Sequence, residues 1–596
     1  MNSNIKNRDE IEDRYKWNLG AMYKSLEEVK QDMAKVQELL EQFKNYGGRL
    51  DNRETILEAL LLQDQCDQLM EKCYTFAHMR LDQDNTNTES LALFDQVKTL
   101  YVFYSETFSF FIPELMKLDY AHLQSYGQEE KFQDYRHFIK EIGRNKEHIL
   151  SESEERILSS FGELAGAPKS IFQILNNADL KFGTVTNEKN EPLELTHGRY
   201  QLFMQSGSRK VRQAAYNELY RVYTSFKNTI AQTLGNSVKK DCLWARLRKH
   251  NSALEASLFA DNVSVSVYQQ LIQAVHNNIG YLHKYIDFRR QVMKLPELHM
   301  YDLYVPLVTE LNKEYSYEEA VETMYQGLSH LGETYLQDLK QGLENGWVDV
   351  FENKGKTSGA YSTGAYGSHP YILLNFNHTM NDVFTLAHEA GHAMHTYYSH
   401  RNQPYRNASY TIFLAEVAST LNENLLIHYL LGQTTQPKEK LFLLNYNLEQ
   451  YRTTVYRQTM FAEFEKMIHE RVEQGGSLTP DSLCEMYYDL NKFYYQGVVL
   501  DDEIAMEWAR IPHFYNAFYV YKYATGFSAA VALANQILSG GPEARARYLE
   551  FLSSGGKDYP LELLKKAGVN METPQPVEEC LRTFGQRLEM AIQVPH

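Results

Sequence analysis

Apolar residues recur at helical spacing along most of this chain, and few residues interrupt them. Ser25 followed by Glu28 is typical of the capping box that opens a helix. Val29, Met33 and Val36 then repeat on one face of that helix. Only 15 of the 596 residues are proline, which is about half of the usual share of ~5%, so helix breakers are scarce. The sequence therefore predicts a mostly α-helical protein.

Two stretches break this helical pattern. Near residues 180–195, two short apolar runs flank the polar segment TNEKNE, which predicts a hairpin. Between residues 347 and 378, the runs WVDVFE and YILLNFN flank the loop GKTSGAYSTGAYGSHP, which predicts a small β-sheet around a glycine-rich loop. We place one boundary near residue 200, between an N-terminal helical region, 1–200, and a second region, 201–596.

Composition and charge exclude several classes of protein. The formal net charge of −17 argues against nucleic-acid binding, which requires clustered Lys and Arg. The five cysteines include no CxxC pair, so they form neither a disulfide framework nor a thiolate metal site. The sequence shows neither a signal peptide nor a stretch of about eighteen consecutive apolar residues. We therefore expect a cytoplasmic protein that binds neither nucleic acid nor a membrane.

Residues 388–392, His-Glu-Ala-Gly-His, form an HExxH pattern on a predicted helix that Asn381 or Asp382 can cap. Residues four apart share one helix face, so His388 and His392 can converge on one metal ion. Glu389 points to a different azimuth, where it can act as a general base on water that zinc has acidified. The pattern predicts a catalytic zinc site. The alternative is a helix whose histidines only form hydrogen bonds within the fold.

A catalytic zinc site needs a third protein ligand. His395 lies on nearly the same stripe as His392, but three ligands from one straight helix rarely complete a tetrahedron. Glu416 fits better, because it lies on a second predicted helix, after a loop long enough to turn the chain back. Glu423, two turns beyond Glu416, is interpreted as a solvated carboxylate, or as one that contacts a metal ligand without binding the metal itself.

Three segments together resemble the thimet-oligopeptidase family, and most closely its oligoendopeptidase F branch: HEAGHAMH, AEVASTLNE and IPHFYNAFYVYKYATG. The N-terminal RYKWNLGAMYKSLEE also resembles the opening of that branch, so the resemblance spans nearly the whole chain. It implies that His388, His392 and Glu416 bind one zinc ion and that Glu389 is the catalytic base. It further implies two helical lobes around a deep channel, with region 201–596 carrying the catalytic site.

Peptide hydrolysis also needs hydrogen-bond donors for the negative charge that develops on the carbonyl oxygen. Most tyrosines of the run HFYNAFYVYKYATGF are interpreted as core residues. In the family, a His followed by tyrosines binds substrate and the oxyanion, and His513 matches that His. The matching tyrosines are ranked Tyr523, then Tyr519, then Tyr515, across a small gap in the match.

The segment GAYSTGAYGSHP followed by YILLNFN resembles the family's flexible glycine-rich loop and the strand beside the active-site helix. We expect residues 371–377 to be an edge strand that holds an extended peptide by main-chain hydrogen bonds. Glycines that flank the loop tyrosines would let the loop close over the peptide. The alternative is an ordinary surface loop and a buried strand.

The sequence thus predicts a zinc endopeptidase that hydrolyses internal bonds of short unstructured peptides and excludes folded proteins. One alternative is a carboxypeptidase or dipeptidyl carboxypeptidase, in which Arg510 or Lys522 would anchor the terminal carboxylate of the substrate. Another is a helical binding protein with a structural metal, but such a site needs four protein ligands and no general base.

Overall fold

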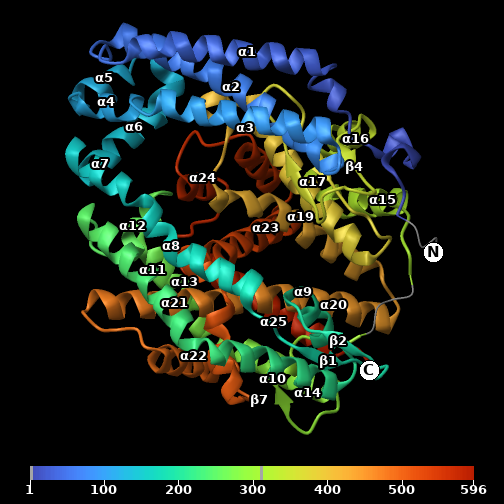
Figure 1. The fold of residues 1–596 in the computed structure, drawn as a ribbon. Coiled ribbons are helices and arrows are strands. Elements are labelled where there is room, and N and C mark those ends of the chain that lie inside the picture. The colour runs from blue at the N-terminus through green and yellow to red at the C-terminus, as the bar shows by residue number, and fades with distance from the viewer. Residues whose placement is uncertain (1–4, 309–312, 596) are drawn as a thin grey trace. The chain divides into compact units, whose positions relative to one another are not determined.

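The computed structural model describes residues 5–308 and 313–595. The described part of the chain is mainly helical with three small sheets (Figure 1). It divides into two compact units. Unit 1 takes Met1–Lys146, Lys313–Tyr429 and Leu533–Val569, and unit 2 takes Glu147–Asn312, Leu430–Ala532 and Asn570–His596. The units interleave along the chain. The boundary near residue 200 concerns sequence regions and stays a prediction.

Unit 1 contains the segment with the HExxH pattern. Its helices and strands are α1 (Leu26–Phe43), α2 (Arg53–Gln83), α3 (Thr88–Phe108), α4 (Phe111–Lys117), α5 (Tyr120–Tyr126), α6 (Arg136–Asn145), α15 (Tyr317–Gly327), α16 (Glu333–Glu344), β4 (Val348–Asp349), β5 (Tyr361–Thr363), β6 (Tyr371–Leu373), α17 (Met380–Asn402), α18 (Tyr405–Ala408) and α24 (Pro560–Lys566). Two long helices, α19 (Ile412–Gln433) and α23 (Tyr521–Leu552), contribute residues to both units.

Unit 2 contains the aromatic run that begins at His513. Its helices and strands are α7 (Glu152–Ser160), α8 (Gly162–Ile174), β1 (Thr184–Thr186), β2 (Pro192–Glu194), α9 (His197–Met204), α10 (Arg209–Ser225), α11 (Lys227–Leu247), α12 (Ala253–Phe259), α13 (Val265–Asn277), α14 (Ile279–Val292), β3 (Leu298–His299), α20 (Pro437–Tyr451), α21 (Arg457–Glu473), α22 (Pro480–Tyr494), β7 (Val498–Val499), two 3-10 helices, η11 (Asp502–Arg510) and η12 (Pro512–Tyr515), and α25 (Gln575–Ile592).

Local sequence patterns predicted several elements correctly. Ser25 caps α1 by accepting a hydrogen bond from the Glu28 N–H at 3.3 Å. The hairpin predicted near residues 180–195 is confirmed, because β1 and β2 pair antiparallel with Val185 opposite Leu193. Within the described residues, no helix combines the length and apolar character needed to cross a lipid bilayer.

The sheet of unit 1 lies beside α17 and is packed against the N-terminal helices (Figure 1). Tyr371 and Leu373 of β6 are fully buried in one core with apolar residues of α1, α2 and α3. Arg8, near the N-terminus, binds the buried Asp349 of β4 at 2.5 Å, and Lys356 binds the same carboxylate at 2.8 Å. The N-terminal segment therefore helps to hold the sheet on which the candidate site is built.

The sheet order is β4-β6-β5, so the strand at Tyr371–Leu373 is central and not at the edge. β4 pairs with β6 in parallel and β5 pairs with it antiparallel. This corrects the prediction that residues 371–377 offer an edge for a peptide. The two edge strands are β4 and β5, and β5 contacts α17.

The loop tyrosines are hydrogen-bonded within unit 1. The Tyr361 hydroxyl donates to the Asp82 carboxylate at 2.6 Å, and the Tyr366 hydroxyl donates to the main-chain carbonyl of Gln403 at 2.9 Å. Both hydroxyls thus bind the body of unit 1, and the closure of the loop over a peptide stays a prediction.

Candidate active site

Helix α17 begins at a capping box. The Thr379 hydroxyl accepts from the Asp382 N–H at 3.3 Å, while the Asp382 carboxylate accepts from the Thr379 N–H at 2.8 Å. The N-cap is therefore Thr379, and neither Asn381 nor Asp382 as the sequence analysis expected. Asp382 completes the box, and its charge is favourable near the positive end of the helix dipole.

His388, His392 and Glu416 come together as the sequence analysis expected. One ligand atom from each lies within 4.8 Å of the other two. The Glu416 Oε2 atom is 3.4 Å from the His388 Nε2 and 3.6 Å from the His392 Nε2. The two imidazole rings are 4.9 Å apart and lie at 77° to each other. Two nitrogens and one carboxylate oxygen that converge in this way match the donor set of a catalytic zinc site.

Helix α19 can bring Glu416 to this point because it crosses α17 at a glycine. A Cβ added at Gly391 would lie 2.5 Å from the Ser419 Cα and 2.7 Å from the Ala418 carbonyl oxygen. Only glycine therefore allows this close approach. The buried Asn422 of α19 donates from its Nδ2 to the Ala387 carbonyl at 3.1 Å and fixes the crossing further.

Two more side chains of α19 support the cluster. The Glu423 Oε1 lies 2.5 Å from the His388 Nδ1, so it fixes the ring and leaves Nε2 to face the cluster. This agrees with the interpretation of Glu423 as a supporting carboxylate. The Ser419 hydroxyl donates to the Glu416 Oε2 at 3.1 Å. The sequence analysis missed Ser419, although its position three residues after Glu416 places it on the same face of the helix.

Glu389 is buried, with 7% of its surface exposed, and burial raises the pKa of its carboxyl above the ordinary value. Within the described residues, its Oε2 atom has no hydrogen-bond partner. A carboxylate in such surroundings has the basicity and the vacant acceptor that a general base needs.

The charges of the cluster support one another. Burial alone would lower the pKa of His388, but hydrogen bonds to Glu416 and Glu423 outweigh it and raise this pKa to about 10. Burial alone would raise the pKa of Glu416, but hydrogen bonds from the imidazoles of His388 and His392 hold this pKa far below its ordinary range.

His395, the alternative third ligand, lies elsewhere. It is 1% exposed, and its ring stacks on Tyr410 with centroids 3.7 Å apart. Burial lowers the pKa of His395 to about 3, so the imidazole is neutral. It supports the segment between α17 and α19 through packing.

The close crossing of α17 and α19 leads to a testable prediction. Gly391→Ala should push α19 away from α17, which destabilises the protein by about 1–3 kcal/mol or more and weakens metal binding. Gly432→Ala on α19 is the matched control, since a Cβ there meets nothing within 4 Å. Calorimetric metal titration and thermal unfolding of both variants provide the measurement. Wild-type metal affinity in Gly391→Ala would show that the crossing does not position Glu416.

The predicted oxyanion donors belong to unit 2, where three of them form one aromatic cluster. The ring of His513 lies 6.4 Å from that of Tyr519 and 6.0 Å from that of Tyr523, and all three side chains are partly exposed. Tyr515 differs, because it is buried and its hydroxyl is 2.6 Å from that of Thr233. The structure thus favours Tyr523 and Tyr519 over Tyr515, and their catalytic role stays a prediction.

The two cations considered for a carboxypeptidase are already close to carboxylates. Lys522 binds Asp261 at 2.6 Å. The Arg510 guanidinium lies 3.7 Å from the buried Glu507 and 5.0 Å from the centre of the Tyr200 ring. Neither cation is therefore well disposed to anchor the carboxylate of a substrate.

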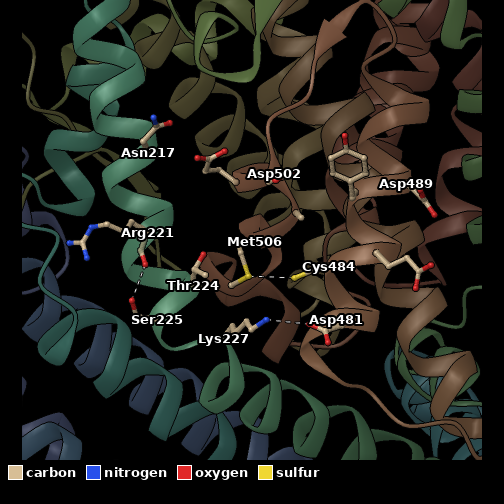
Figure 2. A pocket seen from close by; sticks show the side chains of 14 residues that line it. Asn217, Arg221, Thr224, Ser225, Lys227, Asp481, Cys484, Asp489, Asp502 and Met506 are labelled. Atoms are coloured by element: carbon tan, nitrogen blue, oxygen red, sulfur yellow. Dashed lines mark hydrogen bonds and ion pairs between the residues drawn. The ribbon is translucent and has the colours of Figure 1, made fainter.

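Unit 2 also holds a pocket of about 760 Å³ between α10, α22 and η11 (Figure 2). Asp481, Asp489 and Asp502 contribute to its acidic lining, and Lys227 pairs with Asp481 at 3.2 Å. None of its 14 lining residues is a predicted site residue.

Comparison with known proteins agrees with this geometry. The family described as Peptidase family M3 matches residues 202–583, and the one described as Oligopeptidase F matches residues 114–182. The chain belongs to peptidase family M3. It is a metalloendopeptidase, as the resemblance implied.

Relatives match over nearly the full chain. Oligopeptidase PepF of Bacillus subtilis is 44% identical, over 98% of this chain and 88% of that protein. Group B oligopeptidase PepB of Streptococcus agalactiae is 39% identical, over 98% and 97%. The solved structure of oligoendopeptidase-F from Enterococcus faecium is 37% identical, with a TM-score of 0.74 over 95% of this chain and 99% of that chain. A solved structure from Chlamydophila abortus is 35% identical, with a TM-score of 0.95 over 99% and 100%.

Proposed function

We propose that this M3 metalloendopeptidase binds one zinc ion and cuts internal bonds of short, unstructured peptides. The observation that carries the proposal is the convergence of His388, His392 and Glu416 on one point beside the buried carboxylate of Glu389. Within the described residues, this cluster offers three metal-binding side chains. Three protein ligands are typical of catalytic zinc, whereas a structural site would need four.

The residues of the cluster have distinct tasks. His388, His392 and Glu416 would hold the ion, and Glu423 and Ser419 would orient two of these ligands. When bound, zinc supplies Lewis acidity, which acidifies water and polarises a carbonyl group. Glu389 accepts a proton from the attacking water at its carboxylate and passes it to the leaving amine.

The proposed reaction also needs hydrogen-bond donors. We assign His513, Tyr523 and Tyr519 to the oxygen that becomes negatively charged in the transition state. Removal of one such donor typically costs about 10²–10³-fold in kcat. Their common cluster and partial exposure support this assignment.

The edge strand β5 suits the binding of a peptide backbone. Ile372 and Leu374 donate their N–H groups to main-chain carbonyls on the β4 side, at 2.8 Å each. The main-chain N–H and C=O groups of Tyr371 and Leu373 therefore point to β5, because those of successive residues point to opposite sides of a strand. The same alternation directs the N–H and C=O of Ser362 away from β6. An extended peptide can pair there, and such pairing is insensitive to the identity of its side chains.

Substrate size tests this proposal. A peptide blocked at both ends should be cut internally, whereas the same segment in a loop of a stable folded protein should survive, because a fixed loop cannot extend along a strand. Matched molar amounts of both substrates, followed by mass spectrometry of the fragments, provide the measurement. Equal cleavage rates would contradict the preference for unstructured peptides. Cleavage of unblocked peptides alone would favour the carboxypeptidase alternative.

A further inference from the structure

The turn at residues 516–520 joins the proposed donors of unit 2. It links His513 in η12 to Tyr519 and to Tyr523 in the first turn of α23. Within this turn, Phe518 adopts a φ of +56°, in the left-handed region that side chains other than glycine rarely occupy. A residue keeps such a conformation only when its surroundings enforce it.

Glu465 of α21 supplies one such constraint. Its Oε1 atom accepts a hydrogen bond from the Phe518 N–H at 3.1 Å. The Glu465 side chain is completely buried, and within the described residues its Oε2 atom has no hydrogen-bond partner. A buried polar atom left without a partner is unfavourable for stability, which points to a role for Glu465 beyond stability. Burial also raises the pKa of this carboxyl well above its ordinary value.

Two neighbours hold the same turn. His469, one helical turn after Glu465, packs its ring against Phe518 with centroids 4.5 Å apart, and its Nδ1 lies 2.8 Å from the Glu465 carbonyl oxygen. The Ser257 hydroxyl of α12 donates to the Ala517 carbonyl at 3.0 Å. The turn is therefore fixed from α21 and α12 by contacts to consecutive residues.

We propose that Glu465 is a positioning residue, which sets Tyr519 and Tyr523 relative to His513 through its hydrogen bond to the Phe518 N–H. The inference rests on the proposed function, in which these three side chains stabilise the oxyanion. A change in the conformation of the turn displaces donors that act in the transition state, so it lowers kcat more than it raises KM.

Variants of Glu465 test the inference. Glu465→Leu removes the acceptor and should lower kcat about 10- to 100-fold, with KM within about twofold of wild type and unchanged zinc content. Glu465→Gln keeps an acceptor oxygen and should rescue kcat to within about threefold of wild type. Glu465→Asp retracts the carboxyl by one methylene and should lie between, which provides a second variant if the Leu protein does not fold.

Thr459→Val is the matched control on the same helix. Thr459 is fully buried, and within the described residues its hydroxyl has no hydrogen-bond partner. Its loss should leave kcat and KM unchanged, which separates the effect on the turn from a general effect of altered packing in α21.

A double-mutant cycle decides whether Glu465 acts through the tyrosines. In a background that carries both Tyr519→Phe and Tyr523→Phe, Glu465→Leu should cost less than about threefold in kcat, because both donors that it positions are already absent. Full additivity, or wild-type kcat in Glu465→Leu, would overturn the inference and leave the proposed function intact. Wild-type kcat in both Tyr519→Phe and Tyr523→Phe would overturn the oxyanion assignment and the inference with it.

Discussion

Glu389→Gln is expected to lower kcat by about 10²–10⁴-fold, the contribution typical of a general acid or base, and to keep one zinc ion per chain. Glutamine has nearly the shape of glutamate but cannot accept the proton of the attacking water. The three proposed ligands remain, and in the wild type the Glu389 Oε2 has no hydrogen-bond partner to lose within the described residues. Single-turnover kinetics and metal analysis of the same sample provide the measurement.

Glu344→Gln in α16 is the control for loss of a glutamate charge, because this side chain is 65% exposed and lies 3.9 Å from Lys340. It should behave as wild type. Near-normal turnover by zinc-loaded Glu389→Gln would refute the role of Glu389 as the base. Loss of zinc from that variant would instead make Glu389 a metal ligand.

Glu416→Ala is expected to weaken zinc binding by more than about 100-fold, since loss of a supporting partner alone costs about 10–100-fold. The reason is geometric: Glu416 supplies the only oxygen of the described three-residue cluster and the only ligand from α19. Competition with a chromophoric chelator measures the affinity directly, without reliance on activity.

His395→Phe is the matched variant of the other candidate ligand. It removes both ring nitrogens but keeps an aromatic ring against Tyr410. Zinc should stay near one per chain, and His395→Ala should also keep the metal. If Glu416→Ala retained zinc with wild-type affinity while His395→Phe lost it, the two roles would be exchanged.

The metal cluster could be predicted because its determinants are local. Four-residue spacing places His388 and His392 on one helix face, and a loop before a second helix brings back Glu416. The strand order could not be predicted. β4 pairs in parallel with β6, although more than 20 residues of chain separate the two strands, and the periodicity of a sequence does not show which strands pair. The candidate edge therefore moved from residues 371–377 to β5.

The aromatic run shows a similar limit. Its spacing alone does not separate the buried Tyr515 from the partly exposed Tyr519 and Tyr523. The turn between Tyr515 and Tyr519 contains the left-handed Phe518, whose N–H binds Glu465, more than 50 residues earlier in the chain. The N-cap of α17 was also missed, because Thr379, Asn381 and Asp382 are all residue types that cap helices.

The measurement that tests the central claim most directly is the cleavage of a peptide blocked at both ends while zinc is titrated into chelator-stripped protein. The account predicts no cleavage without metal, a linear rise in rate with added zinc, and saturation at one equivalent per chain. Internal fragments should increase in parallel. Cleavage at the full rate by protein that is verifiably free of metal would contradict the account.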